Sequence, residues 1–436
     1  MAGEWTTVRV QDIAVRTATG PFGSAISSKH FLDSGVPVIR GSNLSQVVST
    51  RLDDNGLVFV SEEKAKEFKR SEVRRGDLVF TCWGTIDQVG IIDARAKHDR
   101  YIVSNKQMLL TPDSTRADSL FLYYYFASSE VRAQIINEGI GSSVPGFNLG
   151  QLRSFEIPLP PLAEQKAIAA MLGALDDKIE LNRRMNATLE AMARALFQSW
   201  FVDFDPVRAK LDARQPPGLD EATVALFPAT FQDSTLGPIP RGWEVCPLSE
   251  KIQLLSGGTP KTSEPTYWDG DIPWYSVRDA PTETDVWVIH TDKTVTKLGI
   301  ANSAAQILPE KTTIISARGT VGKLALTAVP MAMNQSCYGV RGITGYGDYF
   351  TYYLLREATA QLQQRTHGTV FDTITTETFE SLDCIFPTLE ITATFEKRVE
   401  PLLGRMRANL HQSRTLATLR DALLPKLLSG ELLIST

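Results

Sequence analysis

The chain has 436 residues and a formal net charge of −5, with 43% hydrophobic and 22% charged residues, as in an ordinary soluble globular protein. This length predicts two or more domains, and the lack of a long apolar run or an apolar leader predicts a cytoplasmic chain without membrane contact. Four widely spaced cysteines and five scattered histidines argue against a disulfide framework or a metal site, whereas the mild negative charge still allows local basic patches that bind DNA.

The first part of the chain predicts strands and loops. Short β-branched runs, separated by Gly, Pro and Asn turns, stand at 36–40, 78–81 and 90–93. One helical pattern interrupts them near 118–138, and its aromatic stretch "LYYYF" at 122–126 favours a helix core over a stacking platform. The proline-rich "IPLPP" at 157–161 ends this region. We therefore expect a mixed α/β domain.

A long helix follows, with Pro161 in its first turn. Alternating steps of four and three residues trace one seam through Ile168, Leu172, Leu175, Ile179, Asn182, Asn186, Leu189, Ala193, Leu196 and Trp200. A period of 3.5 residues is typical of coiled-coil packing, and a buried Asn pair costs stability but fixes register and partner. "DDK" at 176–178 matches half of a nuclease metal motif, but its place within the helix favours a solvated charge pattern.

Residues 206–241 are rich in Pro and small polar residues, which predicts a connection between two domains. Within this segment, Leu226, Phe227 and Phe231 are apolar. We expect these three side chains to hold the connection against a domain surface.

"LLSGGTPKT" at 254–262 looks at first like a phosphate-binding loop. Such a loop needs G-x-x-x-x-G-K-[ST], but here Leu254 stands in place of the first glycine. Pro260 precedes Lys261 and has no N–H to donate to a phosphate. We therefore interpret the stretch as a tight glycine turn, with Gly257 and Gly258 allowing the backbone to turn.

The second half of the chain repeats the first in order, at an offset near 230 residues. Seven segments match, among them "ATGPFGSAI" at 18–26 with 254–262, "GVPVIRGSNL" at 35–44 with "DIPWYSVRDA" at 271–280, "LVFTCWGTIDQVGII" at 78–92 with "TIISARGTVGKLAL" at 313–326, Asn105-Lys106-Gln107 with Asn334-Gln335, and "GSSVPGFN" at 141–148 with "HGTVFDTI" at 367–374. The chain is therefore a tandem duplication of a unit of roughly 200 residues, too long for a solenoid repeat.

The repeat includes a second long helix. Its seam runs through Phe395, Val399, Leu402, Met406, Asn409, Ser413, Leu416, Arg420, Leu423 and Leu427. Both seams turn polar at the same positions, which favours pairing of the two helices over separate packing on each domain. A helix over 163–200 would span about 57 Å and act as a ruler between the domains. Pro401 predicts a kink or a restart of the second helix.

Helix direction stays open at this point, because the polar centre matches equally well in a parallel pair. A pseudo-twofold arrangement of the duplicated units makes the pair antiparallel, and we adopt it. The fold class we expect is α+β, with two mixed α/β domains and two long helices in an antiparallel coiled coil. The boundaries we expect are 1–157, 158–205, 206–241, 242–388 and 389–432.

Motifs for catalysis are missing. The sequence contains no (N/D)PP(Y/F), G-x-S-x-G or H-E-x-x-H motif. We therefore expect no catalytic residue, no metal site and no cofactor in this chain, and a binding or scaffolding role.

The sequence resembles the specificity subunits of type I restriction-modification enzymes. Residues 157–207 look like their central conserved region, "LRDALLPKLLSGEL" at 419–432 looks like their C-terminal conserved region, and "GWEVCPLSE" with "LLSGGTPKT" and "GDIPWYSVRDA" is similar to the opening of a target-recognition domain. One departure is "FPTLEITATFEK" before the second helix, which lacks the full P-L-P-P-x-x-E-Q.

The resemblance implies that each domain reads one half of a split target in double-stranded DNA. It further implies that the helices set the gap and dock two methyltransferase subunits and, through them, restriction subunits. S-adenosylmethionine, Mg and ATP would then belong to the partner subunits.

Polar side chains on the domain loops are suited to base edges and phosphates. The candidates for DNA contact are Arg40, Asn43, Lys106 and Gln107 in the first copy, and Lys261, Thr262, Tyr275, Arg278, Arg318, Asn334 and Gln335 in the second. Residues 395–426 hold seven Lys and Arg against three acids, which suits DNA or an acidic partner as well as a solvated face. The alternatives left open are a standalone DNA-binding regulator and a scaffold without a DNA role.

Overall fold

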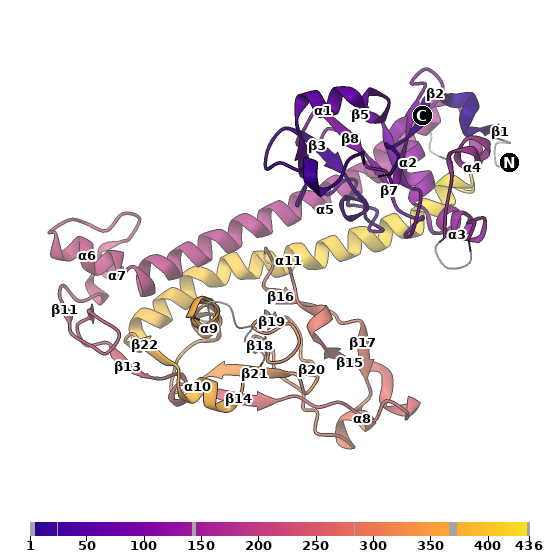
Figure 1. The fold of residues 1–436 in the computed structure, drawn as a ribbon. Helices are drawn as coiled ribbons and strands as arrows, with labels where there is room; N and C mark the ends of the chain where they lie inside the picture. Colours follow the sequence, from indigo (N-terminus) through magenta and orange to yellow (C-terminus); the bar gives the residue numbers. More distant parts are fainter. Residues whose placement is uncertain (1–4, 24, 142–144, 283, 366–372, 434–436) are drawn as a thin grey trace. The chain divides into compact units, whose positions relative to one another are not determined.

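The computed structural model describes residues 5–23, 25–141, 145–282, 284–365 and 373–433. They form two compact units, one of residues 1–180 with 414–436 and one of residues 181–413. Two long helices, α5 (Leu162–Phe197) and α11 (Leu389–Leu428), contribute to both units (Figure 1). No helix within the described ranges is long and apolar enough to cross a membrane.

The first unit holds two four-stranded sheets and a separate two-stranded sheet. One sheet has the order β2 (Ala14–Thr19), β9 (Gln107–Pro112), β6 (Leu78–Thr81) and β7 (Val89–Ile91). The other has the order β4 (Val58–Val60), β3 (Val36–Ile39), β8 (Arg100–Val103) and β5 (Glu72–Arg74), in which β3 and β8 are parallel. β1 (Thr6–Arg9) pairs antiparallel with β10 (Glu156–Leu159).

The helical pattern expected near 118–138 is two helices, α2 (Ser119–Ala127) and α3 (Ser129–Asn137). Ser128 separates them, since its hydroxyl accepts the N–H of Val131 and caps α3. All five side chains of "LYYYF" are buried in the core of the first unit, so the prediction of a helix core is confirmed. Two short helices, α1 (Glu62–Glu67) and α4 (Leu149–Ser154), complete this domain.

The second unit repeats this arrangement with a five-stranded and a three-stranded sheet in place of the two four-stranded sheets. β13 (Glu244–Pro247) pairs with β22 (Asp383–Phe386), as β1 pairs with β10. One sheet has the order β14 (Ile252–Ser256), β21 (Cys337–Gly342), β18 (Thr313–Ser316), β19 (Leu324–Thr327) and β16 (Trp287–Val288). The other has β17 (Lys293–Val295), β15 (Trp268–Tyr275) and β20 (Ala332–Met333), in which β15 and β20 are parallel.

The helices of the second unit differ more. A single helix, α9 (Asp348–Arg365), stands where α2 and α3 stand in the first unit, and two short helices are α8 (Lys297–Ala301) and α10 (Thr376–Glu380). The tandem duplication inferred from the sequence is thus present as a duplicated sheet topology. In the matched pair 141–148 and 367–374, residues 142–144 and 367–372 lie outside the described residues.

The connection 206–241 has more structure than its composition predicts. It contains α6 (Asp205–Leu211), α7 (Glu221–Leu226) and a pair of two-residue strands, β11 (Phe231–Gln232) and β12 (Ile239–Pro240). Phe227 is buried in the core of the second unit, with Leu226 and Phe231 packed against that core. The three apolar side chains therefore hold the connection in place, as expected.

The long helices pack antiparallel within each unit. In the second unit Phe197 near the end of α5 meets Phe395 near the start of α11, with ring centroids 5.8 Å apart. In the first unit Asp176 of α5 pairs with Arg420, near the end of α11. The helix restart expected at Pro401 is wrong, because α11 is one helix over 40 residues. Pro401 lies within this helix with its side chain exposed.

Candidate nucleic-acid interface and helix seam

Four loops of the first domain converge beyond one end of its sheets, joined by backbone hydrogen bonds. Gly20 N–H donates to Gln107 O at 2.8 Å, and Ser104 N–H donates to Ile39 O at 2.9 Å. Cys82 N–H donates to Lys106 O at 2.7 Å. The loops that follow β2, β3 and β6 are therefore all fastened to the turn between β8 and β9.

The second domain builds the same cluster. Gly258 N–H donates to Met333 O at 2.9 Å, and Asn334 N–H donates to Tyr275 O at 2.9 Å. Ala317 N–H donates to Ser336 O at 2.8 Å. The bonds donated by Ser104 and Asn334 are equivalent, and Asn105 therefore corresponds to Gln335. The sequence alignment, which set Asn105 against Asn334, is shifted by one residue.

The candidate residues of the first copy divide by exposure. Lys106 is exposed on the turn between β8 and β9, which is the central turn of the cluster. Arg40 is partly buried, with Nη2 donating to Gly56 O at 2.9 Å. Asn43 and Gln107 are buried: Asn43 Nδ2 donates to Asp53 O and Asn55 O, and Gln107 Oε1 accepts from the Ser104 hydroxyl. In this conformation Asn43 and Gln107 brace the loops and are not presented to a ligand.

The candidates of the second copy divide in the same way. Those with exposed side chains are Lys261, Thr262, Arg278, Arg318 and Gln335. Asn334 is partly buried, and its Oδ1 accepts from Ser336 N–H at 3.1 Å. Tyr275 is completely buried and its hydroxyl has no hydrogen-bond partner, so it forms part of the domain core. Burial raises the pKa of Tyr275 well above its usual range, which keeps the phenol neutral.

The glycines of "LLSGGTPKT" serve close packing. A Cβ on Gly257 would lie 1.9 Å from Asn334 O, and one on Gly258 would lie 2.2 Å from Ala305 N. Neither glycine has a positive φ, so the tight turn expected from the sequence is not the reason for them. Gly20 has the same role in the first copy, since its Cβ would lie 1.8 Å from Ser104 O. These contacts bring the loop against the central turn.

The helix seam is polar at its centre and buried there. Asn409 Nδ2 donates to Asn186 Oδ1 at 2.9 Å, and Asn182 Nδ2 donates to Gln412 Oε1 at 2.9 Å. Asn186 Nδ2 donates in turn to Asp285 of the second domain at 3.0 Å. The polar layer therefore joins both helices and the second domain.

The other seam positions follow the expected stripe with one systematic shift. The seam residues that are buried are Ile168, Leu172, Asn182, Asn186, Ala193, Trp200, Phe395, Val399, Met406, Asn409, Arg420 and Leu427. Those that are partly buried are Leu175, Ile179, Leu189, Leu196, Leu402, Ser413, Leu416 and Leu423. At several of the partly buried positions the next side chain along the chain is buried instead, as in Asp176, Glu190, Phe197, Leu403 and Leu424. There each helix packs against its domain as well as against its partner.

Asp176 corrects the interpretation of "DDK" as a solvated charge pattern. Its side chain has no exposed surface and forms an ion pair with Arg420 at 2.7 Å. Tyr124 donates its hydroxyl to the same carboxylate at 2.7 Å, and Arg51 donates to the Tyr124 oxygen at 3.1 Å. Asp93 then pairs with Arg51 at 2.5 Å. This chain of contacts joins the helix pair of the first unit to its α/β domain.

The excess of basic residues in 395–426 is partly neutralised inside the protein. Arg398 pairs with Asp220 at 2.5 Å, and Arg407 pairs with Glu310 at 3.2 Å. With Arg420 held by Asp176 and Lys426 3.9 Å from Glu431, four of the seven basic side chains have acidic partners outside 395–426. Among the described residues, no group of three or more His, Cys, Asp or Glu is placed to hold a metal ion.

Comparison with known proteins decides the family. The family described as "Type I restriction modification DNA specificity domain" matches residues 2–191 and 240–402. The chain belongs to this family. It is similar to the type I restriction enzyme HindI specificity subunit of Haemophilus influenzae, with 28% identity over 377 residues that cover 77% of this chain and 82% of that protein.

Two further relatives span nearly the whole specificity subunit. The type I restriction enzyme MjaIX specificity subunit of Methanocaldococcus jannaschii is 25% identical over 433 residues, covering 98% of this chain and 94% of that protein. The crystal structure of the type I restriction-modification S subunit from M. genitalium has the same fold, with a TM-score of 0.55 at 14% identity over 99% of this chain and 96% of that chain. The resemblance expected from the sequence is confirmed.

Two exposed aromatic side chains of this specificity subunit were not among the sequence candidates. Trp83 lies on the hairpin turn after β6 and is 48% exposed, and Phe22 lies on the loop after β2 and is 89% exposed. Both belong to the loops that converge on Lys106. The sequence does hold a signal for Trp83, since "CWGT" aligns with "ARGT" and sets Trp83 opposite the candidate Arg318.

Proposed function

We propose that this specificity subunit reads a bipartite site in double-stranded DNA, one half with each loop cluster. The observation that carries the proposal is the repeated cluster itself: the same loops meet in both copies and two of the three backbone hydrogen bonds between them are equivalent, while the exposed side chains differ. In the first copy these are Lys106 and the two aromatic residues, and in the second they include Lys261, Arg318 and Gln335. A common scaffold with different donors suits two half-sites of different sequence.

The helices supply the proposed docking surface for two methyltransferase subunits. The first unit exposes Met171 and Leu419 on the helices, and the second exposes Leu181 and Met192. Exposed Met and Leu side chains on a helix are suited to an apolar partner surface. In this proposal the partners bring S-adenosylmethionine, Mg and ATP, this chain supplies no catalytic residue, and the complex acts on DNA in the cytoplasm.

The DNA half of the proposal is tested by adenine-methylation mapping. Cells express this chain with its methyltransferase subunit, and a second strain expresses a chimera whose residues 1–157 come from a relative. We expect one split motif from the first strain, and a motif changed in one half only from the second. A change in both halves, or in neither, would contradict the assignment of one half-site to each domain. A DNA-binding regulator that acts alone would give no methylation at all.

The docking half is tested by co-purification. Leu181→Glu with Met192→Glu places two charges on the exposed helix face and should abolish binding of the methyltransferase subunit. Leu298→Glu is the matched control, because Leu298 is equally exposed but lies on α8 of the recognition domain. If the helix variant still co-purifies like the control, this face is not the docking surface.

A further inference from the structure

The turn after β6 and the turn after β18 are the same structure with different side chains at the tip. Gly84 and Gly319 have φ of 92° and 79°, values that favour glycine. Phe147 N–H donates to Cys82 O, as Ile374 N–H donates to Ala317 O, both at 2.9 Å. The residue between, Trp83 in one copy and Arg318 in the other, is therefore held at the same place by a rigid backbone.

Trp83 is fixed on one face and open on the other. A Cβ on Gly146 would lie 2.5 Å from Cζ3 and 2.8 Å from Cε3 of the indole, so the ring lies directly against the backbone of Gly146. An antiparallel bridge between Trp83 and Gly146 fixes the two backbones as well. About half of the side chain nevertheless stays exposed. A large aromatic ring held open to water on a rigid turn is available to stack on a planar ligand.

The surroundings of Trp83 favour nucleic acid as that ligand. Lys106 is exposed on the turn whose carbonyl accepts from Cys82, the residue before Trp83. Phe22 is exposed on the loop fastened to the other side of that turn through Asn105, whose Nδ2 donates to Gly23 O at 3.0 Å. A cation beside open aromatic rings matches a phosphate beside a base. The matching position of the second copy carries Arg318, another group suited to DNA.

We propose that Trp83 stacks on a base at one locally unstacked step of the first half-site. Arg318, at the matching place, contacts the second half-site through charge and hydrogen bonds. This inference rests on the proposed function. Aromatic side chains that enter a base step in this way widen or kink it. The same backbone turn would then read one half-site by stacking and the other by charge and hydrogen bonds.

Affinity and salt dependence separate the two modes. Trp83→Ala removes stacking and should weaken binding about 5- to 100-fold, with no change in the slope of log K against log salt, because no phosphate charge is neutralised by an indole. Trp83→Phe should stay within about threefold of wild type. Arg318→Ala should instead lower the slope by up to about one ion.

The experiment uses the full chain assembled with its methyltransferase subunits and a duplex carrying the mapped target. 2-Aminopurine replaces one base at a time, leaving out the adenines that are methylated. We expect one position in the first half-site to change fluorescence on binding by wild type and Trp83→Phe, but not by Trp83→Ala. Positions in the second half-site should respond alike in all three. Co-purification with the methyltransferase subunit checks assembly.

A second variant keeps the test decisive if Trp83→Ala does not assemble. Trp83→Arg copies the side chain that the same turn carries at 318, so it should fold, lose the 2-aminopurine signal and steepen the salt slope. Unchanged affinity and fluorescence in Trp83→Ala or Trp83→Arg would overturn the proposal. If the wild-type complex binds no specific DNA, the proposed function fails and the stacking role fails with it. If wild type binds its target, and Trp83→Ala and Trp83→Arg have the same affinity and fluorescence as wild type, the stacking role alone fails.

Discussion

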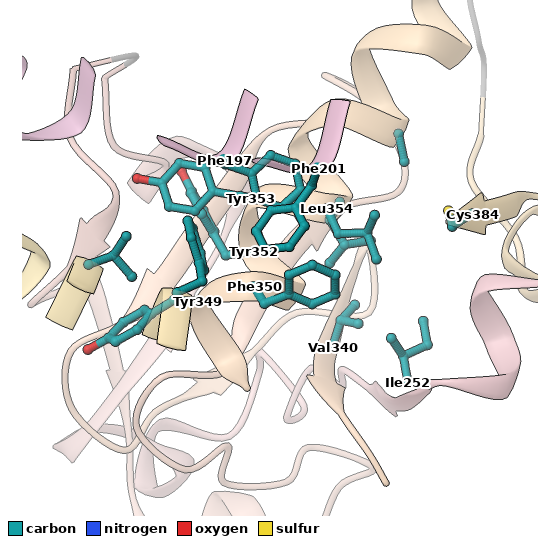
Figure 2. Packing of buried hydrophobic residues seen from close by; sticks show 14 of the residues in the cluster. Phe197, Phe201, Ile252, Val340, Tyr349, Phe350, Tyr352, Tyr353, Leu354 and Cys384 are labelled. Carbon is teal, nitrogen blue, oxygen red and sulfur yellow. The ribbon is translucent and has the colours of Figure 1, made fainter. Parts of the chain in front are cut away.

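The two units fasten an α/β domain to the long helices in different ways. In the first unit the junction is charged: Asp176 is buried between Arg420 and the Tyr124 hydroxyl. In the second unit the junction is aromatic. Figure 2 shows Phe197 beside Tyr353 and Phe201 beside Phe350, with ring centroids 5.8 Å and 5.1 Å apart.

The duplication allows the two junctions to be compared position by position. The offset of 227 residues between the two seams (from Ile168 to Phe395) sets Asp176 opposite Leu403 and Arg420 opposite Ala193. All four side chains are buried. The same helix position therefore accepts either an ion pair or an apolar pair. The fold requires that the junction is closely packed and that every buried polar group in it has a partner, whether the side chains are charged or apolar.

The largest effect should follow from breaking the charged junction. Asp176→Leu leaves Arg420 buried without its main partner, and we expect a loss of about 3–5 kcal/mol in the free energy of unfolding of the first unit. The measurement is native-state hydrogen exchange of amides in the first unit, because the two units need not unfold together. Amides of the second unit serve as the internal reference.

The double variant Asp176→Leu with Arg420→Ala sharpens the comparison, since it copies the pair found in the second unit. We expect it to recover most of the lost stability, because replacing both members of a buried ion pair by apolar groups is often close to neutral. A double variant as unstable as the single one would mean that Tyr124 and Arg51 depend on the carboxylate, and that the junctions are not interchangeable.

A smaller loss is expected in the aromatic junction. Phe395 meets Phe197, Trp200, Phe201 and Tyr353 with ring centroids 5.2–6.2 Å apart. Phe395→Leu keeps an apolar side chain but loses these ring contacts, and should cost about 1–3 kcal/mol. The loss should be the same at low and high salt, because no charge is removed. Hydrogen exchange of the second unit at two salt concentrations checks this.

How much of this could be read from the sequence depends on the range of the interactions. The strands, the duplication and the 3.5-residue seam arise from local periodicity, and the pattern alone predicted them. The burial of Asp176 could not be predicted, because it depends on Tyr124 from 52 residues earlier and on Arg420 from the other end of the chain. A carboxylate inside "DDK" looks solvated until those partners are known.

The same limit applies to the loop candidates. Asn43, Gln107 and Tyr275 have suitable chemistry for DNA contact, yet long-range packing buries all three. Trp83 shows the reverse case. Its residue type predicts burial, but the structure covers one side of the ring with the backbone of Gly146 and leaves about half of the side chain exposed. Residue type therefore predicted the loops that form each cluster, and tertiary packing decides which side chains they present.

Each long helix supplies a side chain that caps the start of a helix of its own unit, α2 in the first unit and α9 in the second. In the first unit Gln165 of α5 accepts the N–H of Asp118 at the start of α2, at 2.8 Å. In the second unit Glu396 of α11 accepts the N–H of Phe350 at the start of α9, at 2.7 Å. Burial raises the pKa of Glu396 to about 7, with the nearby Asp348 adding to the rise and Lys311 opposing it. One cap is neutral at every pH and the other titrates.

The sign of the pH effect follows from this raised pKa. A carboxyl with a folded pKa near 7, against 4.5 when unfolded, stabilises the second unit fully below pH 4.5 and loses that contribution as the pH rises through 7. Glu396→Gln keeps an oxygen that accepts from Phe350 and removes the charge. The variant should exceed wild type by about 1–3 kcal/mol at pH 8 and equal it near pH 4. Hydrogen exchange of α9 amides at both pH values measures the difference, with Gln165→Glu as the mirror variant that should make the first unit pH-dependent in the same direction. A stability gain in Glu396→Gln that is equal at both pH values would show that the carboxyl is ionised throughout and that the two caps differ only in shape.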